Sequence, residues 1–331
     1  MKKTLLWILI AVAVAALTGC GYILYRTSRT QPDLHFDNPT IPRAFFPHHN
    51  GTIELFEGSN FVVNTGVSYS SINRTTLEKL RGMGMDIEEC SAPIFGRGDD
   101  GKLRTFTDYV KVTLPIGGYQ LDVDSVYHTI YWRPTGEIIN TVSDVNMIVT
   151  ENNQVNQLGM DFLENFILEF QYYRKCIALR SRVEEDYQEL GTMYSPRTFE
   201  NFLGFGHRYY IDARVDNHEQ HPFYLQSGMD YVSMKLPIGD TVIAKGNLNP
   251  DMFRSVEGPA DIRLVKNAFV ELGTRSGTHE VFYTPHFTAK YCINPLRYFT
   301  QDVAMDFSGG KIYLRPFAVL RYSHLQEDTE L

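Results

Sequence analysis

The chain has 331 residues, of which 43% are hydrophobic and 13% aromatic, so it carries enough apolar material for more than one packed core. Its formal net charge of −8, with no compensating cluster of Lys and Arg, gives no attraction for phosphate backbones, and a nucleic-acid partner is not expected. Its cysteines are widely spaced and no two histidines show a metal-ligand spacing, so no metal or other cofactor is expected.

The N-terminus is typical of an export segment. Lys2 and Lys3 precede an apolar run from Leu5 to Tyr25, which is about the length that spans a bilayer. Leu17-Thr18-Gly19-Cys20 also resembles a bacterial lipobox, in which Cys20 becomes lipidated after cleavage. A lipid anchor and a transmembrane helix are both open at this point. Either anchor predicts a protein of the cell envelope whose body lies outside the cytoplasm.

After this signal or anchor segment, residues 1–25, the chain is expected to form a tether and then a β-rich body. The tether, residues 26–50, holds four prolines and no sustained apolar period. From Thr52 onward, short alternating stretches between Gly, Asn and Asp turn signals predict strands, as at Tyr109–Ile116. Helical patterns are sparse, and short helices are expected only at Thr75–Met83 and Asp161–Phe166.

One ordered set of features occurs twice in the body. Phe61–Ser70 has a counterpart in Phe223–Val232, and Phe170–Leu179 has one in Met305–Leu314. Between these markers each half carries an alternating strand that ends at glycine. The preserved order predicts an internal duplication. The predicted segments are a first lobe at 51–185, a second and more divergent lobe at 200–317, and a C-terminal tail at 318–331.

Two short motifs carry a family resemblance. Asn64-Thr65-Gly66 and Gln226-Ser227-Gly228 resemble the Asp-Thr-Gly and Asp-Ser-Gly triads of the aspartic protease superfamily, most closely its bacterial retropepsin-like group. Leu158–Leu163 resembles the family's later Leu-Gly-Met-Asp-Phe-Leu segment, and Arg97-Gly98-Asp99 occupies the place of its substrate-covering flap. The resemblance implies a mainly β, bilobal fold of two duplicated retropepsin-like β-barrel halves with few short helices, plus the N-terminal membrane anchor.

The resemblance also implies that no catalytic residue is intact. The family's paired carboxylates share one proton and activate water, whereas Asn64 and Gln226 are neutral amides. Asp161 and Asp230 are poor substitutes, since neither follows a strand end, and they are expected to be a helix cap and a turn residue. The scaffold around the lost acids is kept, and the expected binding residues are Thr65, Gly66, Ser227, Gly228, Arg97, Gly98 and Asp99.

The expected function is therefore a pseudoprotease that binds an extended peptide or envelope protein segment between its lobes. One alternative is an active aspartic endopeptidase that uses a substitute carboxylate, and another is a purely structural envelope protein. A monomer is expected, because an internal duplication removes the need for a second chain. The sequence leaves open whether Cys90, Cys176 and Cys292 form a disulfide bridge.

Overall fold

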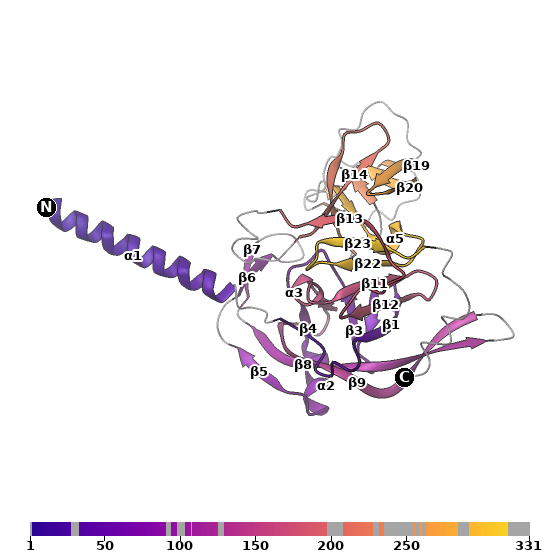
Figure 1. The fold of residues 1–331 in the computed structure, drawn as a ribbon. Helices are drawn as coiled ribbons and strands as arrows, with labels where there is room; N and C mark the ends of the chain where they lie inside the picture. Colours follow the sequence, from indigo (N-terminus) through magenta and orange to yellow (C-terminus); the bar gives the residue numbers. More distant parts are fainter. Residues whose placement is uncertain are drawn as a thin grey trace.

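The computed structural model describes residues 2–27, 33–90, 94–97, 103–106, 108–124, 129–196, 208–227, 232–234, 254–255, 258–259, 263–283 and 291–316. The chain is mainly β, as the sequence predicts, and one long helix, α1 (Lys2–Thr27), precedes the strands. In Figure 1 this helix projects from one side of the body. The apolar side chains that the structure describes on this helix are exposed, with Trp7 at 69% and Leu17 at 73%. Within the described part of the chain, no helix has both the length and the apolar character needed to cross a bilayer.

The remaining elements fall into two halves. The first half contains β1 (Arg43–His49), β2 (Thr52–Glu54), β3 (Asn60–Val63), β4 (Ser71–Asn73), α2 (Arg74–Gly82), β5 (Ile87–Cys90), β6 (Ile94–Arg97), β7 (Leu103–Phe106), β8 (Tyr109–Asp124), β9 (Thr129–Thr150), β10 (Asn156–Leu158), α3 (Met160–Leu163), β11 (Ile167–Gln171) and β12 (Cys176–Arg180). The second half contains β13 (Gln188–Tyr194), β14 (Tyr210–Val215), β15 (His221–Leu225), β16 (Val232–Met234), β17 (Arg254–Ser255), β18 (Gly258–Pro259), β19 (Arg263–Leu272), β20 (Arg275–Tyr283), β21 (Tyr291–Ile293), α5 (Pro295–Tyr298), β22 (Val303–Asp306) and β23 (Lys311–Leu314).

The two halves repeat the same strand pairings. In the first half β3 runs parallel to β10, and β10 pairs antiparallel with β4. In the second half β15 runs parallel to β21, and β21 pairs antiparallel with β16. The next neighbours also correspond, since β4 is parallel to β9 and β16 is parallel to β20, with hairpins β8–β9 and β19–β20 beside them. The repeated order of features that the sequence predicts is thus present in the strand pairings.

A sheet of six strands joins the halves, in the order β1, β12, β11, β22, β23 and β13. Its central contact is the antiparallel pairing of β11 with β22, in which Ile167 lies opposite Asp306 and Phe170 opposite Val303. Figure 1 shows these strands between the two halves. The backbone of one half is therefore hydrogen-bonded directly to that of the other, and the apolar core is continuous through the described residues of both halves.

The C-terminal part of the segment predicted as a tether, residues 26–50, packs on the body, because Arg43–His49 forms β1. Alternate side chains of β1, Ala44 and Phe46, are buried, and Leu34 and Phe36 before the strand are also buried. Proline is tolerated in an edge strand such as β1, so the prolines that favoured a tether do not exclude a strand. The equivalent edge strand of the second half, β13, falls between the predicted lobes.

The helices near the motifs differ from each other in how they begin. The helix α2 follows Asn73 as expected, and the Asn73 side chain accepts a hydrogen bond from the Thr76 N–H at 2.9 Å. The helix α3 begins after Gly159, which caps it without a side chain, so the predicted cap role of Asp161 is wrong. Asp161 Oδ1 instead accepts hydrogen bonds from the N–H and the hydroxyl of Ser70.

Candidate functional site

Asn64 and Gln226 occupy equivalent positions in the two halves. Asn64 directly follows β3, and its N–H donates to the Leu158 carbonyl of the parallel strand at 3.0 Å. Gln226 directly follows β15, and its N–H donates to the Ile293 carbonyl at 2.9 Å. The two residues end matching strands and are held by matching backbone bonds. The pairing of the two motifs that the sequence predicts is therefore present in the structure.

The residues that follow them, Thr65 and Ser227, are bonded to each other across the two halves. The Thr65 N–H donates to Ser227 Oγ at 3.0 Å, and the Ser227 N–H donates to Thr65 Oγ1 at 2.9 Å. Each hydroxyl also donates to the opposite strand, Thr65 to the Leu225 carbonyl at 2.8 Å and Ser227 to the Val63 carbonyl at 2.6 Å. Both side chains are almost fully buried. The four bonds form a reciprocal clamp between the halves.

Two further residues, which were not predicted from the sequence, strengthen this clamp. The Tyr224 hydroxyl donates to the Thr65 carbonyl at 3.0 Å, and burial raises the pKa of Tyr224, so the hydroxyl stays a proton donor. Asn294 Nδ2 donates to the Ser227 carbonyl at 3.3 Å. Tyr224 lies inside the strand that leads to Gln226. Because both of its neighbours, Phe223 and Leu225, are apolar, the sequence does not distinguish Tyr224 from an ordinary core residue.

The two amide side chains have different surroundings. Asn64 Nδ2 donates to Gln157 Oε1 at 3.1 Å, and Asn64 Oδ1 accepts from the Gly66 N–H at 2.9 Å. Among the described residues, Gln226 finds no hydrogen-bond partner for its side chain. Both side chains lie against Gly66, because a Cβ added there would lie 2.7 Å from Gln226 Cγ and 2.9 Å from Asn64 Oδ1. Glycine is therefore required between the two amides.

The arrangement carries no acid at the place where the motifs meet. Asp161 lies close in sequence to β10, but its carboxylate is bonded to Ser70 and to the Phe162 N–H and is part of the local backbone structure. Gly228 and Asp230 lie outside the described residues. No three His, Cys, Asp or Glu side chains within the described ranges lie together in a way that would hold a metal ion.

The predicted flap corresponds to a separate two-stranded hairpin, β6–β7. Arg97 ends β6 and pairs with Leu103 of β7, while Gly98 and Asp99 lie outside the described residues. The second half has a short hairpin, β17–β18, at the corresponding place between β16 and β19. Arg97, Gly98 and Asp99 remain a predicted part of the binding site.

A cavity of about 950 Å³ lies away from the two motifs, in the second half. It is bordered by β13, β14 and the turns β14–β15 and β19–β20, and its charged groups include an ion pair between Arg214 and Glu271. Neither Asn64 nor Gln226 lines it. Its wall consists of Gly191, Thr192, Ile211, Asp212, Ala213, Arg214, Asn217, His218, Glu219, Gln220, Glu271, Gly273, Thr274, Arg275 and Ser276.

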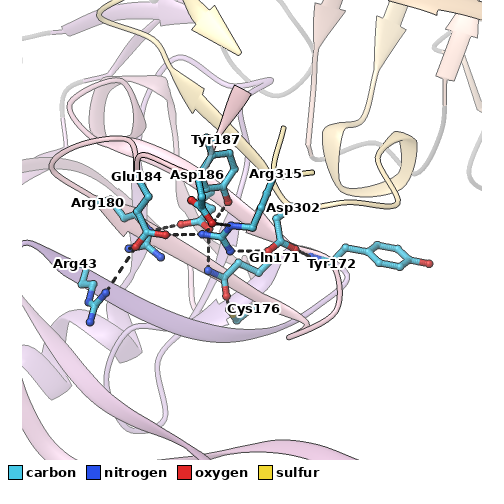
Figure 2. Close-up of polar contacts among 11 residues, drawn as sticks. Arg43, Gln171, Tyr172, Cys176, Arg180, Glu184, Asp186, Tyr187, Asp302 and Arg315 are labelled. Carbon is cyan, nitrogen blue, oxygen red and sulfur yellow. Dashed lines mark hydrogen bonds and ion pairs between the residues drawn. The ribbon is translucent and has the colours of Figure 1, made fainter. Parts of the chain in front are cut away.

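A buried ion network crosses the six-stranded sheet and was not predicted from the sequence (Figure 2). Glu169 on β11 is fully buried and pairs with Arg180 on β12. It also accepts hydrogen bonds from Gln171 at 2.8 Å and from the Tyr187 hydroxyl. Arg315, which follows β23, contacts Glu169 at 3.7 Å. The network thus contains groups from both halves and from the segment that connects them.

Arg315 is the main cation on the second-half side of this network. It pairs with Asp302 at 2.9 Å and with Asp186 at 2.7 Å, and its guanidinium lies 4.5 Å from the centre of the Tyr187 ring. Burial raises the pKa of Asp302, against the lowering effect of Arg315, and the nearby Glu169 raises it further. Arg180 also contacts Glu184 in the connecting segment.

The four cysteines form no disulfide. Cys20 is exposed on α1, and Cys90 is partly exposed. The Cys176 thiol is buried beside the ion network and donates to Gln171 Oε1 at 3.0 Å. Burial raises the pKa of this thiol well above its ordinary value, mainly because the thiolate would be desolvated, so Cys176 is not a reactive nucleophile.

No family model matches the chain, and no curated protein matches it. Among solved structures, it is similar to basic 7S globulin from soybean, with 9% identity and a TM-score of 0.41 over 82% of this chain and 94% of that chain. It is also similar to conglutin gamma, a basic 7S globulin from lupine seeds, with 9% identity and a TM-score of 0.41 over 86% of this chain and 95% of that chain. Likeness at this level does not assign the chain to a family.

Proposed function

We propose that this chain is a pseudoprotease with two aspartic-protease-like lobes, which binds an extended peptide or protein segment between the lobes without cleaving it. The observation that carries the proposal is the reciprocal clamp of Thr65 and Ser227 beside two amide residues. The clamp keeps the ends of β3 and β15 together, where the aspartic proteases hold their two acids. A scaffold kept without its acids favours binding over hydrolysis.

The chemistry of the amides supports the loss of hydrolysis. A pair of carboxyl groups can share one proton, so that one activates water while the other polarises the peptide carbonyl. A carboxamide donates and accepts hydrogen bonds but does not take a proton from water near neutral pH. Asn64 also has both ends of its amide bonded within the protein, to Gln157 and Gly66. Its oxygen is thus already engaged by the Gly66 N–H.

The mode of binding that we propose is strand addition. An extended segment gains its affinity from backbone hydrogen bonds and its selectivity from side-chain pockets. The β6–β7 hairpin, with Arg97, Gly98 and Asp99 at its predicted tip, is proposed to cover the bound segment, and Gly228 to line it. Each chain has both motifs, so we propose that it works as a monomer.

We further propose that the protein is anchored in the bacterial cell envelope through residues 1–25. The exposed apolar side chains of α1 and its position outside the body support attachment to a membrane (Figure 1). Labelling of cells with a radioactive fatty acid distinguishes the two anchors. Label that is lost in Cys20→Ser supports a lipid on Cys20, whereas unlabelled protein that stays in the membrane fraction supports a helix. Protein found only in the soluble fraction contradicts both anchors.

Proteolysis by the purified full chain tests the central proposal. Wild-type protein and the double variant Asn64→Asp, Gln226→Asp are incubated with a mixed peptide library from pH 3 to 8. We expect no cleavage by the wild type and cleavage at acidic pH by the double variant. Cleavage by the wild type would support the alternative of an active endopeptidase with a substitute carboxylate. Absence of both cleavage and peptide binding would favour a purely structural envelope protein.

A further inference from the structure

The two amides of the site are not equivalent, although their backbones are. Asn64 has partners at both ends of its carboxamide, whereas the Gln226 carboxamide has none among the described residues. Gln226 is also only partly buried. A half-buried side chain with one free donor group and one free acceptor is available to a ligand.

The strand register explains why the halves differ. Val63 lies opposite Leu158 in the first half, and Leu225 lies opposite Ile293 in the second. The residue before Leu158 is Gln157, which bonds to Asn64, and the residue before Ile293 is Cys292. A thiol is a weak hydrogen-bond partner, and Cys292 makes no bond to the Gln226 side chain. The second half has therefore lost the residue that would hold its amide in place.

Packing nevertheless limits where the Gln226 side chain can lie. Its Cγ and Nε2 lie 2.7 and 2.8 Å from the point that a Cβ on Gly66 would occupy, so the side chain covers Gly66. Its stem is thus positioned by the opposite half, while its amide end is unpaired. Such a group loses little conformational freedom when it binds, which favours affinity.

We infer that Gln226 recognises the bound segment by pairing its carboxamide with one peptide group of an extended chain. Asn64 is a positioning residue, because its carboxamide is already hydrogen-bonded within the protein. This inference rests on the proposed peptide-binding function. The chemistry favours a peptide group because a carboxamide offers one acceptor and one donor side by side, and a peptide group offers the complementary pair. A carboxylate or an ammonium ion would use only one end of the amide.

An ester scan tests this pairing. End-blocked, unstructured twelve-residue peptides of random sequence are screened against the immobilised full-length protein, and the tightest peptide is resynthesised with single ester bonds in place of successive peptide bonds. An ester bond lacks the N–H of a peptide bond. Replacement of one particular peptide bond should therefore weaken binding to the wild type by about three- to tenfold, the value of one hydrogen bond. In Gln226→Met, binding of the parent peptide should fall by a similar factor, and the loss at that ester position should disappear.

Two further variants keep the result interpretable. Gln226→Glu keeps the length of the side chain over Gly66 but removes the amide donor, and it should also bind the parent peptide more weakly. Gln188→Met makes the same change at an exposed site on β13, and its ester profile should match that of the wild type. Unchanged affinity and an unchanged ester profile in Gln226→Met would overturn the inference and leave peptide binding intact. If no peptide binds the wild type, the proposed function itself fails.

Discussion

Thr65 and Ser227 lie 162 residues apart in the sequence, and each donates its backbone N–H to the hydroxyl of the other. Thr65→Val keeps the shape of the side chain but leaves the Ser227 N–H and the Leu225 carbonyl without their partner. We expect a loss of about 2–4 kcal/mol in the free energy of unfolding, because both groups are buried. Urea denaturation measures this loss, and Thr192→Val, at an exposed position on β13, is the matched control.

The mutual dependence of the two hydroxyls can be measured separately. If Thr65 and Ser227 act as one unit, Thr65→Val and Ser227→Ala together should cost less than their separate effects added. We expect a coupling energy of about 1–2 kcal/mol from the double-mutant cycle. Additive losses would contradict the clamp and indicate two independent local bonds.

Gly66→Ala should destabilise the protein by about 1–3 kcal/mol, since the new methyl group would overlap Gln226 Cγ and Asn64 Oδ1. Gly82→Ala is the control, because a Cβ at Gly82 meets no atom within 4 Å at the end of α2. In a Gln226→Ala background the overlap with Cγ is removed, and part of the loss at Gly66 should be recovered. An equal loss in both backgrounds would mean that Gln226 does not lie over Gly66. Thermal unfolding of the four variants gives the comparison.

The sequence predicted that the motifs containing Thr65 and Ser227 are counterparts, because short local patterns carry this equivalence. The hydroxyl and glycine pairs recur at a constant offset, and the strands before them have the same apolar pattern. The edge strands β1 and β13 were not predicted, because Pro47 and the histidines of β1 and the polar residues of β13 resemble linkers when the sheet they join is unknown. Short strands of this kind gain their stability from pairing partners that are distant in the sequence.

The ion network was equally inaccessible from sequence. Glu169, Arg180 and Arg315 are separated along the chain, and the sequence does not show which of these charges are paired. Only the apolar neighbours Leu168 and Phe170 distinguish Glu169 in the sequence, and the structure shows that every residue of β11 and β12 is buried. Such a position predicts that a charge is paired, but its partner is set by the antiparallel register of β11 with β12, which only the fold supplies.

Glu169→Gln should destabilise the protein strongly. The change leaves Arg180 and Arg315 buried with one fewer negative charge, and removal of one partner from a buried pair costs about 3–5 kcal/mol. Glu78→Gln breaks the exposed pair with Arg81 and should change the free energy of unfolding by less than about 1 kcal/mol. Urea denaturation compares the two variants. A loss at Glu169 no larger than that at Glu78 would show that the network contributes nothing to the junction of the halves.

Asp302→Asn should change the pH dependence of stability. Burial raises the pKa of Asp302 in the folded protein above that of an ordinary aspartate. Arg315 opposes this shift, and Glu169 adds to it. The folded state therefore binds this proton more tightly than the unfolded state. Between the ordinary pKa and the raised pKa, stability from this proton is gained as pH falls and lost as pH rises.

The asparagine variant carries no titrating group, so its stability should lack this contribution. Its side-chain oxygen can still accept the hydrogen bond from the Tyr172 N–H, which limits the structural change at this position. We expect the free energy of unfolding of the wild type, relative to the variant, to decrease as pH rises from about 4 through the folded pKa. Urea denaturation of both proteins at half-unit pH steps measures that difference. A difference that is constant or increases over this range would mean that Asp302 holds its charge at no cost, with Arg315 outweighing its burial.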